Sequence, residues 1–211
     1  MNKILFIDSV TTGMNPEKCA IYRIGGIFTV NGEETQRFEL RMRPFPNARI
    51  SDQSLWICNE TRSSLIRYPS QEDAFEDFLR LLDAQVNLRN PKDKAFIAGF
   101  NVDRFEYPFL REWFHRNGNE RFRDYFYVQT IDLMNLTNFR FLQKRNEFQD
   151  FFLETAAREL GVPTSGDDRY NCLENSRTCL DMYKKLAAEW AVADCKESDL
   201  VADTFKNFKI Q

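Results

Sequence analysis

The sequence has little of the two residue types that build most metal centres and disulfide frameworks. Histidine occurs once, as His115, among 211 residues. Cysteine occurs five times, an odd number, and no two cysteines form a CxxC pair. This scatter excludes a regular disulfide framework and argues against a zinc site. We expect reduced thiols, mostly buried, at Cys19, Cys58, Cys172, Cys179 and Cys195.

Long hydrophobic runs are also missing. The apolar run near the N-terminus, residues 4–7, is shorter than the roughly 7–15 residues of a signal peptide. No segment approaches the ~20 apolar residues that cross a bilayer. We therefore expect a cytoplasmic protein without membrane contact. The formal net charge is −3, so any contact with nucleic acid requires a local basic patch.

Composition and periodicity together predict one α/β domain. A hydrophobic content of 43%, with 20 Phe, supplies material for a sizeable core. We place a single domain at residues 1–195 and a polar C-terminal tail at 196–211. We expect strands at 3–8, 20–30, 35–42, 95–100 and 125–131, and helices at 70–86, 105–118, 148–160 and around 180–190. The Asn31-Gly32 pair predicts a tight hairpin turn, because both residues tolerate positive φ.

An acidic motif closes the first strand. Residues 6–13 read FIDSVTTG, with Asp8 at the end of the apolar run. The segment resembles the first motif of the DnaQ-like (DEDD) 3′–5′ exonucleases, which reads strand–Asp–x–Glu–Thr–x–Gly. Val10 stands where that motif has its second carboxylate.

A second segment resembles the TREX-type branch of the same superfamily. Residues 98–110 read AGFNVDRFEYPFL, and six of them fit that branch's second motif in register: Asn101, Asp103, Arg104, Phe105, Glu106 and Pro108. Glu106 stands at the position of a metal-binding Asp, and Phe100 replaces the usual His. A strand-to-helix turn with a solvated Glu106 is the alternative interpretation.

The third motif is the most altered. The histidine branch carries a His and, five residues later, an Asp, where this chain has Tyr170 and Asn175. Further segments that resemble the family begin at Asp52, Val128 and Phe148, so the resemblance covers about residues 3–190. It implies an RNase H-like α/β fold with a mixed five-stranded sheet and helices on both faces.

The resemblance implies catalysis by two divalent cations, which requires several converging carboxylates. Of the family's three ligands to the first ion, this chain keeps only Asp8. The second ion would retain Asp8 and Glu106. We therefore expect Mg²⁺ or Mn²⁺ to bind weakly, with one ion at most. Tyr170 is a poor replacement for a histidine base, because a tyrosine pKa near 10 leaves about one group in a thousand ionised at neutral pH.

These losses favour a family member that is catalytically inactive and retains binding. The resemblance implies that the 3′ end of single-stranded DNA or RNA is held at Thr11, Thr12, Gly13, Asn101 and Arg104. One alternative is an active metal-dependent 3′–5′ exonuclease, for DNA proofreading, repair or RNA trimming, that uses Asp8 and Glu106 with Asp103 or Asp168. Another is a pure protein-interaction module attached to a replication or repair complex.

Five arginines lie in and after the second motif, interleaved with aromatic residues. They are Arg104, Arg111, Arg116, Arg121 and Arg123. They either contact a single strand or form a solvated face over a buried aromatic core.

Overall fold

The computed structural model describes residues 2–164 and 170–206, and for 192–206 it describes the backbone alone. Within these residues the chain forms one five-stranded mixed sheet in the order β3-β2-β1-β4-β5. Its strands are β1 (Lys3–Thr11), β2 (Ile21–Val30), β3 (Glu33–Arg41), β4 (Phe96–Gly99) and β5 (Ile131–Asp132). β1, β2 and β3 pair antiparallel, whereas β4 and β5 extend the sheet in parallel from β1. The mixed five-stranded sheet is thus confirmed.

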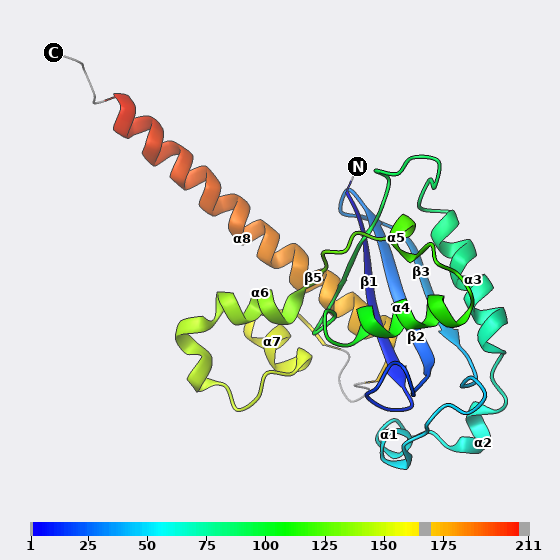
Figure 1. Cartoon of the computed structure of the whole chain (residues 1–211). Helices are drawn as coiled ribbons and strands as arrows, with labels where there is room; N and C mark the ends of the chain where they lie inside the picture. The colour runs from blue at the N-terminus through cyan, green and yellow to red at the C-terminus, as the bar shows by residue number, and fades with distance from the viewer. Residues whose placement is uncertain (1, 165–169, 207–211) are drawn as a thin grey trace.

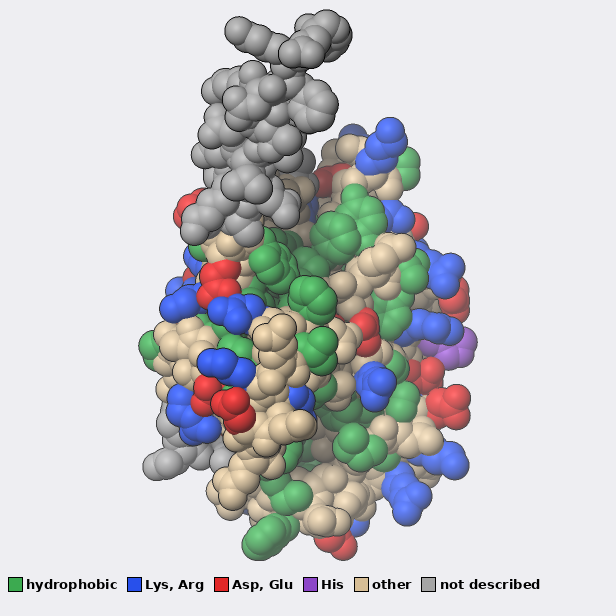
Figure 2. Space-filling view, turned by 90° about the vertical axis from the view of Figure 1, so that its left-hand side faces the viewer, with side chains coloured by type: hydrophobic (Ala, Val, Ile, Leu, Met, Phe, Trp, Pro, Cys, Tyr) green, Lys and Arg blue, Asp and Glu red, His purple; other side chains and the backbone are tan. Residues whose placement is uncertain are grey.

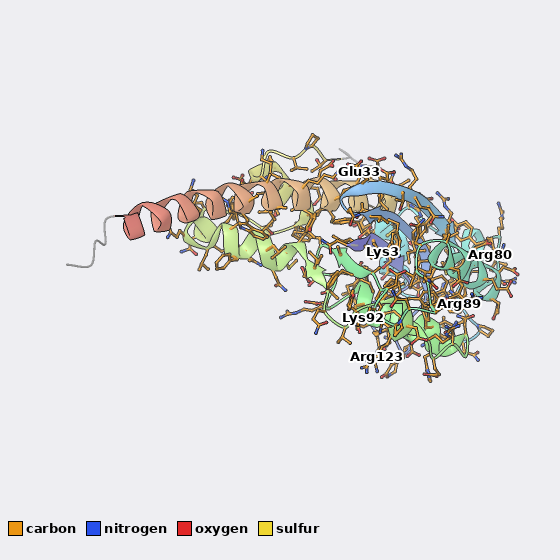
Figure 3. The ribbon with its side chains drawn as sticks, turned by 90° about the horizontal axis from the view of Figure 1, so that it is seen from above. Lys3, Glu33, Arg80, Arg89, Lys92 and Arg123 are labelled. Carbon is orange, nitrogen blue, oxygen red and sulfur yellow. The ribbon has the colours of Figure 1, made fainter. Side chains whose placement is uncertain are left out.

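Helices cover both faces of this sheet (Figure 1). They are α1 (Asp52–Ile57), α2 (Arg62–Leu65), α3 (Gln71–Asp83), α4 (Glu106–Arg116), α5 (Phe122–Tyr125), α6 (Leu133–Arg140), the 3₁₀ helix η1 (Leu142–Glu147), α7 (Leu153–Glu159) and α8 (Cys172–Lys206). Seen from above, α8 and α4 lie on opposite sides of the strands (Figure 3).

The side-chain alternation of β1 divides the interior into two cores. Leu5 and Ile7 face a large core beneath α3, α4 and α5, which is rich in aromatic rings. Ile4 and Phe6 face the opposite core beneath α6, α7 and α8. Because both faces of β1 are buried, its sequence is a continuous apolar run, as expected for a central strand.

Local signals in the sequence explain several boundaries. Asn31 and Gly32 have φ values of 53° and 85°, so the predicted hairpin turn is confirmed. The Ser70 hydroxyl accepts a hydrogen bond from the Asp73 amide at 3.0 Å and caps the start of α3. Gly161, with φ 69°, lies just beyond the end of α7.

The predicted strand at 125–131 is wrong over most of its length. Residues 122–125 form α5, Phe126 makes an isolated bridge to Ala95, and only Ile131–Asp132 joins the sheet. Burial of Phe122, Tyr125 and Phe126 follows a helical turn and not a strand alternation. The apolar and aromatic residues of this stretch therefore gave a false strand signal.

The helix predicted at 148–160 begins later, at Leu153. The Asp150 carboxylate accepts hydrogen bonds from the Phe152 amide at 3.2 Å and the Thr155 hydroxyl at 2.6 Å. Such a side chain fixes the turn before a helix and prevents the helix from starting earlier. The aromatic residues ahead of it, Phe148 and Phe151, pack together with ring centroids 5.9 Å apart.

The last helix crosses the boundary that we placed at 195/196. α8 continues to Lys206, and residues 207–211 of the predicted tail lie outside the described residues. The division into a domain and a tail stays a prediction. Among the described helices, none combines the length and apolar character that a bilayer crossing requires.

The aromatic core beneath α4 generates a stability prediction. Phe114 is fully buried, and its ring lies 4.9 Å from that of Phe75 and 5.1 Å from that of Phe122. We expect Phe114→Ala to lower the free energy of unfolding by roughly 3–5 kcal/mol, because it leaves a cavity. Phe139 is 75% exposed, so Phe139→Ala should change it by less than about 0.5 kcal/mol. Urea unfolding followed by circular dichroism measures both, and equal losses would contradict the prediction.

Candidate functional site

A hollow of about 350 Å³ lies at the carboxyl end of β1. Its walls come from β1 and the turn that follows it, from α1, from the segment between β4 and α4, and from the start of α8. Eight of the residues singled out from the sequence line it together: Asp8, Val10, Thr11, Gly13, Asn101, Glu106, Tyr170 and Asn175. Carboxyl ends of central strands are the usual place for working groups in open α/β sheets.

Asp8 is the carboxylate on β1. Its Oδ2 accepts a hydrogen bond from the Asn175 side-chain amide of α8 at 3.1 Å. Burial raises the pKa of Asp8 from 3.8 to about 6, although hydrogen bonds from Asn175 and Cys172 partly oppose the shift. Asn175, at the position that matches the Asp of the family's third motif, thus directs an N–H group at the carboxylate.

Glu106 is the second acid of the hollow and is only 4% exposed. The Ser9 hydroxyl donates to its Oε1 at 3.3 Å, while Oε2 has no hydrogen-bond partner among the described residues. Burial, and then the charge of Asp8, raise the pKa of Glu106 well above its usual range. A buried carboxylate oxygen without a partner is costly, so this group favours either a proton or a cation.

Val10 occupies the position of the missing acid and belongs to a small apolar cluster. It is 7% exposed and packs with Tyr22, Leu55, Leu65 and Cys172. The cluster joins β1 and β2 to α1, α2 and the first turn of α8. The position is therefore filled by packing and offers no oxygen ligand.

The Thr-Thr-Gly turn is held by internal hydrogen bonds. The Thr11 hydroxyl donates to the Gly13 carbonyl at 2.7 Å. The Thr12 hydroxyl donates to the Arg49 carbonyl at 2.7 Å and accepts from the Ala20 amide at 2.9 Å. Thr12 is fully buried and does not line the hollow, so its side chain fixes the turn.

Asn101 enters the hollow from a strained turn. It has a φ of 64°, a conformation that asparagine tolerates better than most residues. The Asp132 carboxylate fixes the turn by accepting from the amides of Asn101 at 3.1 Å and Asp103 at 3.3 Å. It also caps α6 through the Met134 amide at 2.9 Å. The sequence alone did not indicate this positioning role of Asp132.

Several predicted site residues lie elsewhere. Arg104 is exposed and does not line the hollow. Asp103 is also exposed, and its carboxylate accepts a hydrogen bond from the Thr130 hydroxyl. His115 lies on the outer side of α4, where its Nδ1 is 3.3 Å from Glu120. Asp168 falls outside the described residues.

The wall formed by α1 was not expected from the sequence. Ser54, Ile57 and Cys58 line the hollow, as does Met14, which is 78% exposed. The signals present were the family resemblance of the segment that begins at Asp52 and the cap at Ser51, whose hydroxyl accepts from the Ser54 amide at 3.3 Å.

A buried acid holds this wall in place. Glu60, in the turn between α1 and α2, accepts hydrogen bonds from Tyr68 at 2.6 Å and from Arg23 of β2 at 3.2 Å. Burial opposes ionisation of Glu60, but hydrogen bonds from Ser64 and Tyr68 outweigh it and lower its pKa. The wall is therefore anchored to the sheet by the ion pair between Glu60 and Arg23.

The donors present do not fit a pair of divalent cations. Two carboxylates, Asp8 and Glu106, line the hollow, and Asn175 adds one neutral amide. No three His, Cys, Asp or Glu side chains of the described residues come together as a metal-binding group. Hard cations such as Mg²⁺ need several oxygen ligands, and a two-ion site needs more carboxylates than this.

Comparison with known families and structures agrees with the fold. The exonuclease family model (RNase_T) matches residues 5–150. The chain therefore belongs to this exonuclease family, within the DnaQ-like superfamily. No curated protein sequence matches it.

Solved structures of E. coli exonuclease I have a similar fold. A zinc-bound complex of that protein with single-stranded DNA aligns with a TM-score of 0.70 at 17% identity, over 90% of this chain and 41% of that chain. A complex of the same protein with a 5cy-dT13 oligonucleotide aligns with a TM-score of 0.69 at 16% identity, over 90% of this chain and 41% of that chain. The chain thus spans about two fifths of the length of these neighbours.

The raised pKa of Asp8 predicts an unusual pH dependence. The pKa of Asp8 is about 6 in the folded state, against an ordinary value of 3.8. Between pH 3.8 and 6, Asp8 therefore binds a proton more strongly in the folded than in the unfolded protein. The free energy of unfolding should therefore rise as pH falls through this window. We expect Asp8→Asn to stabilise the metal-free protein at pH 7 by on the order of 1–3 kcal/mol, with the gain vanishing below about pH 4.

Asp93 provides the control of opposite sign. Its pKa is lowered by a hydrogen bond from Lys3, so it stabilises the fold at neutral pH and loses this effect as pH falls. Asp93→Asn should therefore destabilise the protein at pH 7. Urea unfolding in EDTA across pH 4–8 measures both variants, and a destabilised Asp8→Asn protein at pH 7 would refute the assignment of Asp8.

Proposed function

We propose that this protein is a hydrolysis-deficient member of the exonuclease family that holds the 3′ end of a single-stranded nucleic acid in the Asp8 hollow. One observation carries the proposal. The hollow retains two acids, and the position of a third is occupied by Asn175, whose amide donates to Asp8.

The proposed loss of hydrolysis rests on the small number of oxygen ligands that the hollow offers to metal ions. Asp8 and Glu106 suffice for one Mg²⁺ or Mn²⁺ at most, since Val10 supplies no oxygen and Asn175 a single neutral one. Such an ion would supply charge neutralisation for a phosphate. Tyr170, at the position of the family's histidine, is a poor base at neutral pH, and loss of a positioned base typically costs ~10²–10⁴ in rate.

The binding part rests on the shape and lining of the hollow. Phe100, Phe105, Met14 and Ile57 give it apolar surfaces, and Asn101 adds a polar group. Trp56, beside Ile57 on α1, is 79% exposed. Exposed aromatic and apolar side chains provide sequence-tolerant stacking for bases of single strands. The E. coli exonuclease I neighbours include complexes with single-stranded DNA.

Two alternatives each have an observation in their favour. The unpartnered Oε2 of Glu106 favours an active, metal-dependent exonuclease, because a bound cation would satisfy it. Exposed Phe139, Leu142 and Phe152 favour a protein-interaction module, for which a replication or repair protein is the expected partner.

Restoring the family's residues tests the hydrolytic part. We expect the wild type to release 3′-terminal nucleotides from labelled single-stranded DNA or RNA at least ~10²–10⁴ times more slowly than the triple variant Val10→Glu, Tyr170→His, Asn175→Asp. The assay compares Mg²⁺ and Mn²⁺. Robust metal-dependent cleavage by the wild type that disappears in Asp8→Ala would defeat the proposal and support the active enzyme.

Binding is measured separately on the same strands. Fluorescence anisotropy should give wild-type binding that weakens with salt and is lost when the 3′ end is blocked by a bulky group. Equal affinity for strands with a free and with a blocked 3′ end would contradict the proposal that the Asp8 hollow is the binding site. Absence of any binding would leave the protein-interaction module as the function.

A further inference from the structure

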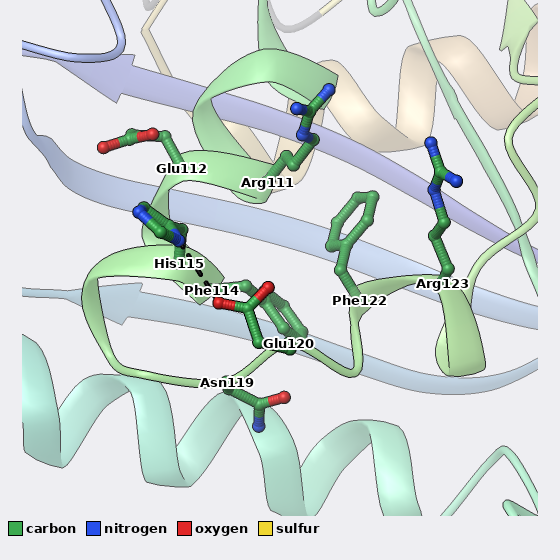
Figure 4. A pocket seen from close by; sticks show the side chains of 8 residues that line it. All are labelled: Arg111, Glu112, Phe114, His115, Asn119, Glu120, Phe122 and Arg123. Carbon is green, nitrogen blue, oxygen red and sulfur yellow. Dashed lines mark hydrogen bonds and ion pairs between the residues drawn. The ribbon is translucent and has the colours of Figure 1, made fainter.

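Two arginines on the outer side of α4 and α5 have no partner of opposite charge among the described residues. Arg111 and Arg123 are exposed and line a second hollow, of about 430 Å³. Their guanidinium groups extend in the same direction on either side of the Phe122 ring (Figure 4). Within the part of the chain that the structure describes, neither guanidinium group forms an ion pair or a hydrogen bond.

The neighbouring charges on the same elements are neutralised. Arg116 pairs with Glu112 at 3.0 Å, and Arg121 pairs with Asp124 at 3.1 Å. The remaining acid of the hollow, Glu120, faces His115. Arg111 and Arg123 are therefore the cations of this face whose charge remains available to a ligand.

α4 carries residues of both hollows. Glu106 lies in the first hollow and begins α4, and Arg111 lies five residues further along the helix, a rise of roughly 7–8 Å. Arg104, two residues before α4, is also exposed and makes no ion pair among the described residues.

Beyond α5 the basic surface continues. The Lys94 ammonium donates to the Arg123 carbonyl, and Lys92 and Arg123 lie on the same side of the molecule (Figure 3). Figure 2 shows Lys and Arg side chains along the side that carries His115, interspersed with Asp and Glu side chains. A chain with a net charge of −3 therefore needs unpaired cations, such as Arg111 and Arg123, to attract phosphates.

We propose that Arg104, Arg111 and Arg123 bind the phosphates of a single strand on the 5′ side of the nucleotide held in the Asp8 hollow. The inference rests on the proposed function and extends it from a terminal nucleotide to the strand behind it. The recognition is electrostatic, so it is independent of base sequence and serves DNA and RNA alike. Phe114 and Phe122, the aromatic residues that line the second hollow, are buried, so stacking contributes little there.

The test compares two probes with fluorescence anisotropy and a competition assay. A strand of about 12 nucleotides can cover both hollows, whereas a dinucleotide reaches only the Asp8 hollow. We expect the double variant Arg111→Gln, Arg123→Gln to bind the long strand more weakly. The slope of log affinity against log salt should fall by about 0.7 for each lost phosphate contact, or about 1.4 in total. Affinity for the dinucleotide should be unchanged.

Matched variants isolate the charge effect. Arg121→Gln, just before α5, and Arg80→Gln, on α3, remove paired and exposed arginines and should leave the slope unchanged. The charge-conserving variant Arg111→Lys, Arg123→Lys should retain most of the wild-type slope. Thermal unfolding checks that all variants are folded.

The outcomes separate the two proposals. A double Gln variant that binds the long strand like the wild type overturns this inference and leaves the 3′-end function in place. A wild type that binds neither probe overturns both. If the double Gln variant lost the same factor of affinity for the long strand and for the dinucleotide, Arg111 and Arg123 would belong to the terminal site. That result would also overturn the inference.

Discussion

The site depends on one hydrogen bond that joins the first strand to the last helix. Asp8 on β1 accepts from Asn175 on α8, at the point where β2 contributes Gly25. A side chain at Gly25 would meet the Leu173 amide nitrogen at 2.6 Å, so the helix start can approach the sheet only over a glycine. The Ser176 hydroxyl also donates to the Gly25 carbonyl at 3.0 Å. This close contact brings residues 167 positions apart into one hollow.

The chemistry follows from what this contact places around Asp8. An amide and a valine stand where the family motifs have acids, and the one acid added by α4, Glu106, is buried and has a raised pKa. The fold is thus that of a phosphodiesterase, while its anionic ligands are reduced to two. In such an environment, a protonated or singly metallated pair of carboxylates is more stable than two free charges. The proposed function therefore separates the architecture of binding from the chemistry of cleavage.

Much of the fold could be predicted because its signals are local. The Asn31-Gly32 turn, the Ser70 cap and the apolar run before Asp8 each have a cause within a few residues. Parts that depend on tertiary contacts could not be predicted. The aromatic residues around Tyr125 are buried by other rings and so mimic a strand, and the position of Arg104 outside the hollow depends on the turn that Asp132 holds.

Ion counting in crystals tests the central claim most directly. Crystals soaked in Mn²⁺ and measured by anomalous diffraction reveal each bound ion without reference to activity. The account predicts no more than one ion in the hollow, bound by the carboxylates of Asp8 and Glu106. Two fully coordinated ions beside β1 would contradict it, because the chain would then assemble a complete two-metal centre from ligands other than those described.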